Sequence, residues 1–171
     1  QPPPPQPMQP QPAQRLQQVL TPVIPEISAL VRATPGCLSL AQGMVSWGPP
    51  EGVAAAVAQA LHDPTVELDR YGAMAGDPVL LEAIQRDLTR SDRAGGVLDL
   101  SGADLLVTAG SNMAFNAIAQ VITNPGDEVI VLLPYYFNHV MAVQLAGGVA
   151  VAVDAGLIPD PERLAAAITP R

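Results

Sequence analysis

A turn of small residues, Gly110-Ser111-Asn112, has the composition of an anion-binding site. It lies between a predicted strand over residues 104–108 and a predicted helix over residues 112–123. Backbone N–H groups at a helix N-terminus have no partner inside the helix, and together with the helix dipole they attract an anion. A phosphate group suits this turn, and the same geometry is compatible with Ser111 acting as an ordinary N-cap.

Three of the six aromatic residues of the chain, Tyr135, Tyr136 and Phe137, directly follow the next predicted strand, over residues 128–133. Ligands of open parallel sheets bind at the carboxyl ends of the strands, where the turn at Gly110 also lies. An aromatic face stacks on a planar ring, and a phenol adds a polar group. The turn and the aromatics therefore predict a site for a flat, phosphorylated cofactor. His139 lies three residues after Tyr136 on the same predicted helical face, which makes it a candidate for a role in this site. The alternative is a purely structural histidine.

The elements that would position these residues alternate between short apolar strands and helices. A third strand is predicted over residues 149–153, and residues 38–40 form a short extended piece. This alternation indicates an α/β fold with a mainly parallel sheet and helices on both faces. Breaks are predicted at Asn124-Pro-Gly-Asp127 and at Gly147-Gly148. The remaining predicted helices cover residues 25–32, 51–62, 78–90, 136–146 and 161–168.

Composition narrows the classes of partner. The net charge is −8 and the basic residues form no cluster, so neither a nucleic acid nor an anionic membrane is an expected partner. No apolar run of about 18 residues predicts a membrane span. The single Cys37 lacks the neighbours of a metal site, and it is compatible with a reducing, cytoplasmic location. The sequence begins with Gln, so an organellar targeting segment upstream of Gln1 stays open as an alternative.

Four landmarks in order resemble the class I/II pyridoxal-phosphate aminotransferases of the fold-type I group. They are Leu38-Ser-Leu-Ala-Gln-Gly43, Arg70-Tyr-Gly-Ala-Met-Ala-Gly76, Val107-Thr-Ala-Gly-Ser-Asn-Met-Ala-Phe115, and Asn124-Pro-Gly-Asp-Glu-Val129 followed by Pro134-Tyr-Tyr136. The resemblance runs from about Pro25 to the C-terminus. The segments Gln42–Pro50 and Pro134–Asn138 are similar to the plant and cyanobacterial branch that acts on aromatic amino acids and methionine.

The resemblance implies the fold-type I large domain, pyridoxal 5′-phosphate as cofactor, and an amino acid and a 2-oxo acid as substrates. Ser111 and Asn112, after Gly110, would hold the cofactor phosphate through backbone N–H groups, and Tyr136 would stack on its ring. His139 is a weaker cofactor-site candidate. Tyr71 would cross the interface of a homodimer to the partner's cofactor.

On the substrate side, the resemblance places Gly43 and Trp47. The family's usual Gly-x-Pro-Asp-Phe segment is replaced by Gly43-Met-Val-Ser-Trp47. Gly43 would let the backbone approach the substrate carboxylate, and Gly43 and Gly110 as plain turn glycines are the alternative. The Trp47 loop and Tyr135 indicate an apolar or aromatic substrate.

The family also needs a Lys that forms a Schiff base with the cofactor, and all eight basic residues here are Arg. No catalytic residue is therefore assigned, and no metal ligand is predicted. We expect residues 1–171 to be the N-terminal portion of a longer enzyme. The alternatives are a non-catalytic short product that binds cofactor weakly or pairs with a full-length relative, and another fold-type I activity such as a C–S lyase.

The expected organisation has three parts. Residues 1–14 contain twelve Pro or Gln, and such a composition predicts disorder. Residues 15–50 would form an N-terminal arm and the substrate-side loop. Residues 51–171 would form the N-terminal part of the cofactor-binding large domain.

Overall fold

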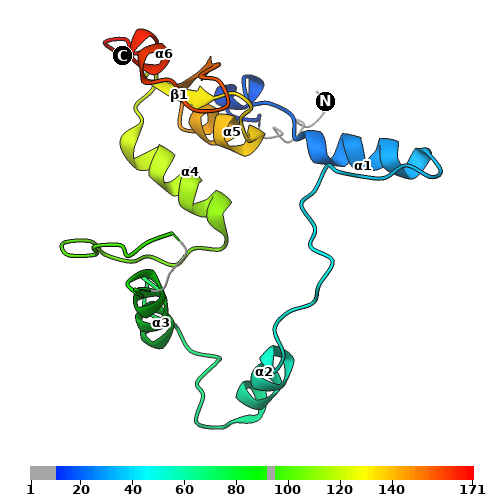
Figure 1. Ribbon diagram of the computed structural model, residues 1–171, viewed down its shortest axis with the longest axis vertical. Helices are drawn as coiled ribbons and strands as arrows, with labels where there is room; N and C mark the ends of the chain where they lie inside the picture. The colour runs from blue at the N-terminus through cyan, green and yellow to red at the C-terminus, as the bar shows by residue number, and fades with distance from the viewer. Residues whose placement is uncertain (1–10, 92–94) are drawn as a thin grey trace, which may run out of the picture. The chain divides into compact units, whose positions relative to one another are not determined.

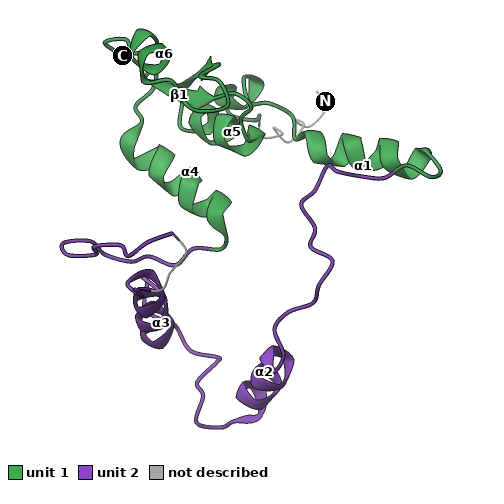
Figure 2. Cartoon of the chain, viewed as in Figure 1, with its two compact units in different colours: residues 1–37, 109–171 green, residues 38–108 purple. Residues whose placement is uncertain are grey.

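The computed structural model describes residues 11–91 and 95–171. Its contacts divide the chain into two compact units, shown in Figure 2. Unit 1 comprises residues 1–37 and 109–171, and unit 2 comprises residues 38–108. The predicted boundaries at residues 14 and 50 stay predictions.

Unit 1 is built on a two-stranded parallel sheet. Strands β1 (Glu128–Leu132) and β2 (Val149–Val153) pair in register from Glu128 opposite Val149 to Leu132 opposite Val153. Parallel strands need a crossover connection, and the helix α5 (Phe137–Leu145) provides it. The α/β class and both of these strands are confirmed (Figure 1).

The buried core of unit 1 lies between the sheet and two helices. Helix α4 (Ser111–Ile122) packs against α5, and α5 packs against both strands. Val143 of α5 is completely buried. The other buried residues are small or β-branched, which suits close packing of a helix on a sheet; they are Ala119, Thr123, Val131, Val140, Ala142 and Ala155.

Two turns at the amino ends of the strands bind to each other. The Asp127 carboxylate accepts hydrogen bonds from the backbone N–H (2.7 Å) and the side-chain amide (3.0 Å) of Asn124. These bonds hold the predicted Asn-Pro-Gly-Asp segment in a turn. Gly147 has φ +86°, a left-handed conformation that ends α5 as predicted. Gly126 donates its N–H to the carbonyl of Gly147 (2.9 Å), so the two turns hold the strand starts side by side.

The N-terminal segment of unit 1 is partly ordered. A 3₁₀-helix, η1 (Gln14–Gln17), contacts α5, and the N–H of Leu20 donates to the Gln144 side chain at 3.0 Å. Helix α1 (Val23–Ala33) extends the predicted helix over residues 25–32 at both ends. Of the Pro/Gln-rich residues 1–14, the first ten lie outside the described residues, so their predicted disorder stays a prediction.

Unit 2 contains two helices, α2 (Val53–His62) and α3 (Pro78–Leu88), joined by irregular loops. Asp77 caps α3, because its carboxylate accepts from the N–H groups of Val79 (2.9 Å) and Leu80 (3.2 Å). Helix α6 (Pro161–Ala166) in unit 1 begins in the same way, with Asp160 accepting from Glu162 N–H at 2.9 Å. Both starts combine an Asp cap with Pro at the first helical position.

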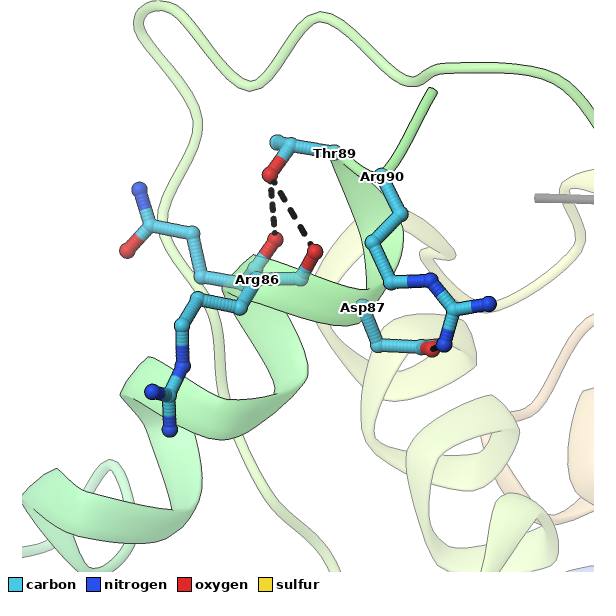
Figure 3. Close-up of polar contacts among 5 residues, drawn as sticks. Arg86, Asp87, Thr89 and Arg90 are labelled. Carbon is cyan, nitrogen blue, oxygen red and sulfur yellow. Dashed lines mark hydrogen bonds and ion pairs between the residues drawn. The ribbon is translucent and has the colours of Figure 1, made fainter. Parts of the chain in front are cut away.

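The C-terminal end of α3 is closed by side chains, as Figure 3 shows. The Thr89 hydroxyl donates to the carbonyls of Gln85 (2.8 Å) and Arg86 (3.4 Å), and the Thr89 backbone N–H also donates to the Gln85 carbonyl at 3.1 Å. Arg90 pairs with Asp87 at 3.2 Å. Since both charged side chains are more than half exposed, this pair adds little stability.

Two predicted extended segments of unit 2 are not strands. Residues 104–108 and 38–40 have no strand structure. The N–H of Val107 donates to the carbonyl of Ala75 at 2.8 Å, in the loop before α3. An apolar run favours an extended chain, but a strand requires a hydrogen-bonded neighbour, and within the described residues only β1 and β2 pair.

Within residues 11–91 and 95–171, no helix combines the length and hydropathy that crossing a membrane requires.

Candidate cofactor site

The turn before α4 has the backbone geometry of an open helix start. Gly110 is the N-cap residue, with φ +84° and ψ +165°, and no side chain caps the helix. Ser111 is the first helical residue, so its interpretation as the N-cap is wrong. The first turn of α4 contains no acidic residue, so no carboxylate of that turn opposes a bound anion. Gly110, Ser111 and Asn112 therefore present a helix N-terminus suited to a phosphate group.

Tyr136 lies at the N-cap of α5, with its side chain 46% exposed. Its hydroxyl oxygen accepts a hydrogen bond from the Asn138 side-chain amide at 2.7 Å. The Asn112 side-chain amide approaches the same oxygen at 3.4 Å, which is a long contact. These contacts bring the predicted phosphate-binding turn and the predicted stacking residue together.

His139 packs between aromatic rings. Its imidazole stacks on Phe115 with centroids 4.0 Å apart and planes 20° apart, and it meets Tyr136 edge to face at 5.5 Å. All three side chains line a cavity of about 350 Å³, within the range of small-ligand sites. The cavity walls are otherwise apolar or aromatic and belong to β1 and the segment after it: Ile130, Val131, Leu132, Pro134 and Tyr135.

The chemistry of this arrangement fits a flat, phosphorylated group. A helix N-terminus can bind the phosphate, and the half-exposed phenol of Tyr136 offers a face for stacking. No group of three or more His, Cys, Asp or Glu side chains is placed to hold a metal ion, among the residues that the structure describes.

The other predicted site residues belong to unit 2. Gly43 and Trp47 lie in the loop before α2, and Trp47 is 72% exposed. Tyr71 lies in the loop between α2 and α3 with its side chain fully exposed. The predicted substrate-side role of Gly43 and Trp47 and the predicted interface role of Tyr71 stay predictions.

Sequence reasoning did not assign roles to three residues that lie beside the predicted site residues. Phe115 stacks on His139, and Asn138 donates to Tyr136. Asn116 lines a cavity of about 170 Å³ together with Asn112 and Asn138, and its side-chain oxygen is buried without a hydrogen-bond partner. The spacing of Asn112 and Asn116, four residues apart, was the available signal, because it places both amides on one helical face.

The sequence of this chain is similar to those of known aminotransferases. The model of the family described as aminotransferase class I and II matches residues 35–170. An aromatic aminotransferase of Arabidopsis thaliana is 33% identical over 147 residues, which are 84% of this chain and 35% of that protein. An aspartate/prephenate aminotransferase of Thermus thermophilus is 37% identical over 138 residues, or 78% of this chain and 34% of that protein.

A solved structure shows the same fold. The crystal structure of the aspartate aminotransferase from Rhizobium meliloti superimposes with a TM-score of 0.77 at 30% identity, covering 94% of this chain and 40% of that one. The chain thus spans about a third of the length of these curated relatives and 40% of this solved structure.

Proposed function

This chain belongs to the aminotransferase class I and II family, and we propose that the complete protein transfers an amino group from an amino acid to a 2-oxo acid with pyridoxal 5′-phosphate. The observation that carries the proposal is the approach of Asn112, in the first turn of α4, to the hydroxyl of Tyr136 at 3.4 Å. It joins an anion-binding helix start to an aromatic face, and a flat phosphorylated cofactor needs both.

The residues that would hold the cofactor all lie in unit 1. Backbone N–H groups of Ser111 and Asn112 would bind the phosphate, and the left-handed Gly110 lets the chain turn into α4. Tyr136 would stack on the ring. His139, fixed by its stacking on Phe115, would stand beside the ring as a neighbour that orients it.

Bound pyridoxal phosphate supplies an electron sink for the α-carbon of the substrate. The part of this chain is to bind the phosphate, orient the ring and keep water from one of its faces. The apolar cavity of about 350 Å³ beside Tyr136 supports the last of these roles. Proton transfer at the α-carbon needs a Lys, which the sequence of residues 1–171 does not contain.

An aromatic amino acid or methionine is the proposed amino donor. Support comes from the exposed Trp47 in the loop after Gly43 and from the similarity to the aromatic aminotransferase of Arabidopsis thaliana. An indole offers a large apolar face to an aromatic or thioether side chain. The similarity to aspartate/prephenate aminotransferase makes aspartate the competing donor.

A homodimer in the cytoplasm completes the proposal. Tyr71 is fully exposed in this chain, so its phenol is available to the cofactor phosphate of a partner subunit. The single Cys37 fits a reducing compartment.

The test uses protein expressed from the complete reading frame. We expect it to bind pyridoxal phosphate with a visible absorbance band, and to form 2-oxo acid from phenylalanine, tyrosine or methionine when 2-oxoglutarate is the acceptor. Aspartate as the best donor would overturn the proposed substrate class. Ammonia release without amino transfer would indicate a lyase, and absence of cofactor binding would overturn the proposal itself.

A second candidate applies to residues 1–171 as a product on their own. All eight basic residues are Arg, so this chain alone offers no side-chain amine for a covalent bond to the cofactor. It would bind pyridoxal phosphate weakly or pair with a full-length relative. Equilibrium dialysis of the 171-residue chain with the cofactor, followed by borohydride reduction and peptide mass mapping, should give no adduct on any side chain, the N-terminal α-amine being the one amine that can react.

A further inference from the structure

The hydroxyl of Tyr136 is held by side-chain amides from two helices. Asn138, in the first turn of α5, donates to the Tyr136 oxygen at 2.7 Å, and Asn112, in the first turn of α4, approaches it at 3.4 Å. The shorter of these is a strong hydrogen bond by distance. One phenol oxygen thus joins the N-terminal turns of two packed helices.

A hydrogen bond at this oxygen constrains the ring in a particular way. The hydroxyl lies on the axis from Cβ through the ring, so a contact there fixes the direction of that axis and leaves rotation about it unchanged. Neighbouring rings restrict the rotation, because Phe137 meets Tyr136 at 5.0 Å and 63°, and His139 meets it at 5.5 Å and 85°. The amides and the rings therefore fix different degrees of freedom.

The hydrogen bond matters for the orientation of the ring because burial does not fix Tyr136. Tyr136 is 46% exposed, whereas Asn138 is half-buried and lies two residues before the buried Val140. An exposed side chain samples several rotamers unless a specific contact selects one. Asn138, which is less exposed than Tyr136, supplies that contact.

We propose that Asn138, assisted by Asn112, is a positioning residue that sets the direction of the Tyr136 ring for stacking on the cofactor. This inference rests on the proposed function, since the ring to be matched is that of pyridoxal phosphate. Asn138 acts through Tyr136 and does not itself touch the cofactor.

The first test measures the contact without cofactor. Asn138→Ala, Tyr136→Phe and the double variant of the complete apoprotein are compared by thermal unfolding. If the hydrogen bond exists, the Tm losses of the two single variants should not add in the double variant. Asn124→Ala is the matched control, because it also removes one side-chain amide donor, to Asp127 at 3.0 Å; its loss should add to that of Tyr136→Phe.

The second test measures positioning in the cofactor-loaded protein. We expect Asn138→Ala to weaken pyridoxal phosphate binding about 3- to 10-fold and to reduce the visible circular dichroism of the bound cofactor. In the Tyr136→Phe background, which keeps the ring but lacks the hydroxyl, Asn138→Ala should change neither quantity further. The control Asn124→Ala should leave the circular dichroism of the bound cofactor unchanged in both backgrounds.

The outcomes separate this inference from the function on which it rests. A wild-type protein that binds no pyridoxal phosphate overturns both. A wild-type protein that binds it, with additive effects of Asn138→Ala and Tyr136→Phe in both tests, overturns the positioning role and leaves the proposed function standing.

Discussion

Gly110 shows how one residue can decide whether a helix start is open to a ligand. Its φ of +84° combined with ψ of +165° is a conformation that residues with a side chain rarely adopt. A Cβ placed on Gly110 would meet no atom within 4 Å. The requirement for glycine is therefore a matter of backbone conformation and not of space.

Gly110→Ala is expected to destabilise the protein by about 1–2 kcal/mol and to weaken pyridoxal phosphate binding. The substitution moves the N–H groups of Ser111 and Asn112 away from the geometry of the open helix start. Thermal unfolding and cofactor titration of the complete protein measure the two effects. Gly72→Ala is the control, since Gly72 has ordinary φ and open space around it; equal losses in the two variants would contradict the argument.

At the residue scale the sequence predicted which of these residues lie close together better than it predicted the contacts between them. Asn112, Tyr136 and His139 are brought together in unit 1, as the order of elements required. The hydrogen bond from Asn138 to Tyr136 could not be predicted, because it depends on the rotamers of two side chains at the start of α5. Spacing along a sequence gives the face of a helix and leaves the rotamers open.

At the scale of elements, the junction between α5 and β2 is closely packed around Gly148. A Cβ on Gly148 would lie 2.6 Å from Thr123 Cγ2 and 3.1 Å from the carbonyl oxygen of Asp127. Thr123 is itself buried at the end of α4. Gly148, just before β2, thus packs against the end of α4 and the residue before β1. This contact leaves no room for a methyl group.

Gly148→Ala is therefore expected to cost about 1–3 kcal/mol of unfolding free energy through overpacking. Thr123→Ser removes the methyl group that the new Cβ would strike. Combined with Gly148→Ala, it should recover part of the loss, as measured by denaturant unfolding of the complete protein. A double variant whose loss equals the sum of the two single losses would argue against this contact as the cause.

The elements themselves were predictable where local signals and tertiary neighbours agree. Strand β2 has its predicted bounds, β1 ends one residue early, and α4 and α5 end within one residue of their predicted limits. Residues 104–108 have the same apolar character as β1 but no strand beside them. Strand formation depends on a partner strand, which can lie far away in sequence, and this dependence explains the difference.

At the scale of the whole molecule, the buried core is confined to unit 1. Every buried residue of the described chain lies between Ala119 and Ala155. In the described part of unit 2 no residue is buried, and large apolar side chains such as Leu40, Met44 and Met74 are more than 80% exposed. Helices without a buried face gain little from packing and open easily.

Hydrogen exchange on the 171-residue chain should reflect this distribution. We expect the slowest amide exchange in α5, β1 and β2, and exchange near the unprotected rate in α2 and α3. The comparison is internal, because all peptides come from one sample. Protection of α2 and α3 equal to that of α5 would show that unit 2 acquires a core of its own in solution.

The proposed role of Tyr71 is a property of an assembly, and an assembly can test it. If Tyr71 serves the partner's cofactor while Tyr136 serves its own, then Tyr71→Ala and Tyr136→Ala each damage both sites of a homodimer. In a mixed dimer of the two variants, one site would receive both defects and the other would receive neither. Two weakly active variants should therefore regain up to about half of the wild-type activity when co-expressed and purified with two different tags.

The same experiment contradicts the proposal if activity does not return. Were Tyr71 to act within its own subunit, each site of the mixed dimer would keep one defect, and mixing would restore nothing. A control dimer of Tyr71→Ala with a second, differently tagged Tyr71→Ala subunit should stay weakly active in either case. Recovery in the mixed dimer alone would place the fully exposed phenol of Tyr71 at the site of the partner, because no other arrangement of the two defects leaves one site intact.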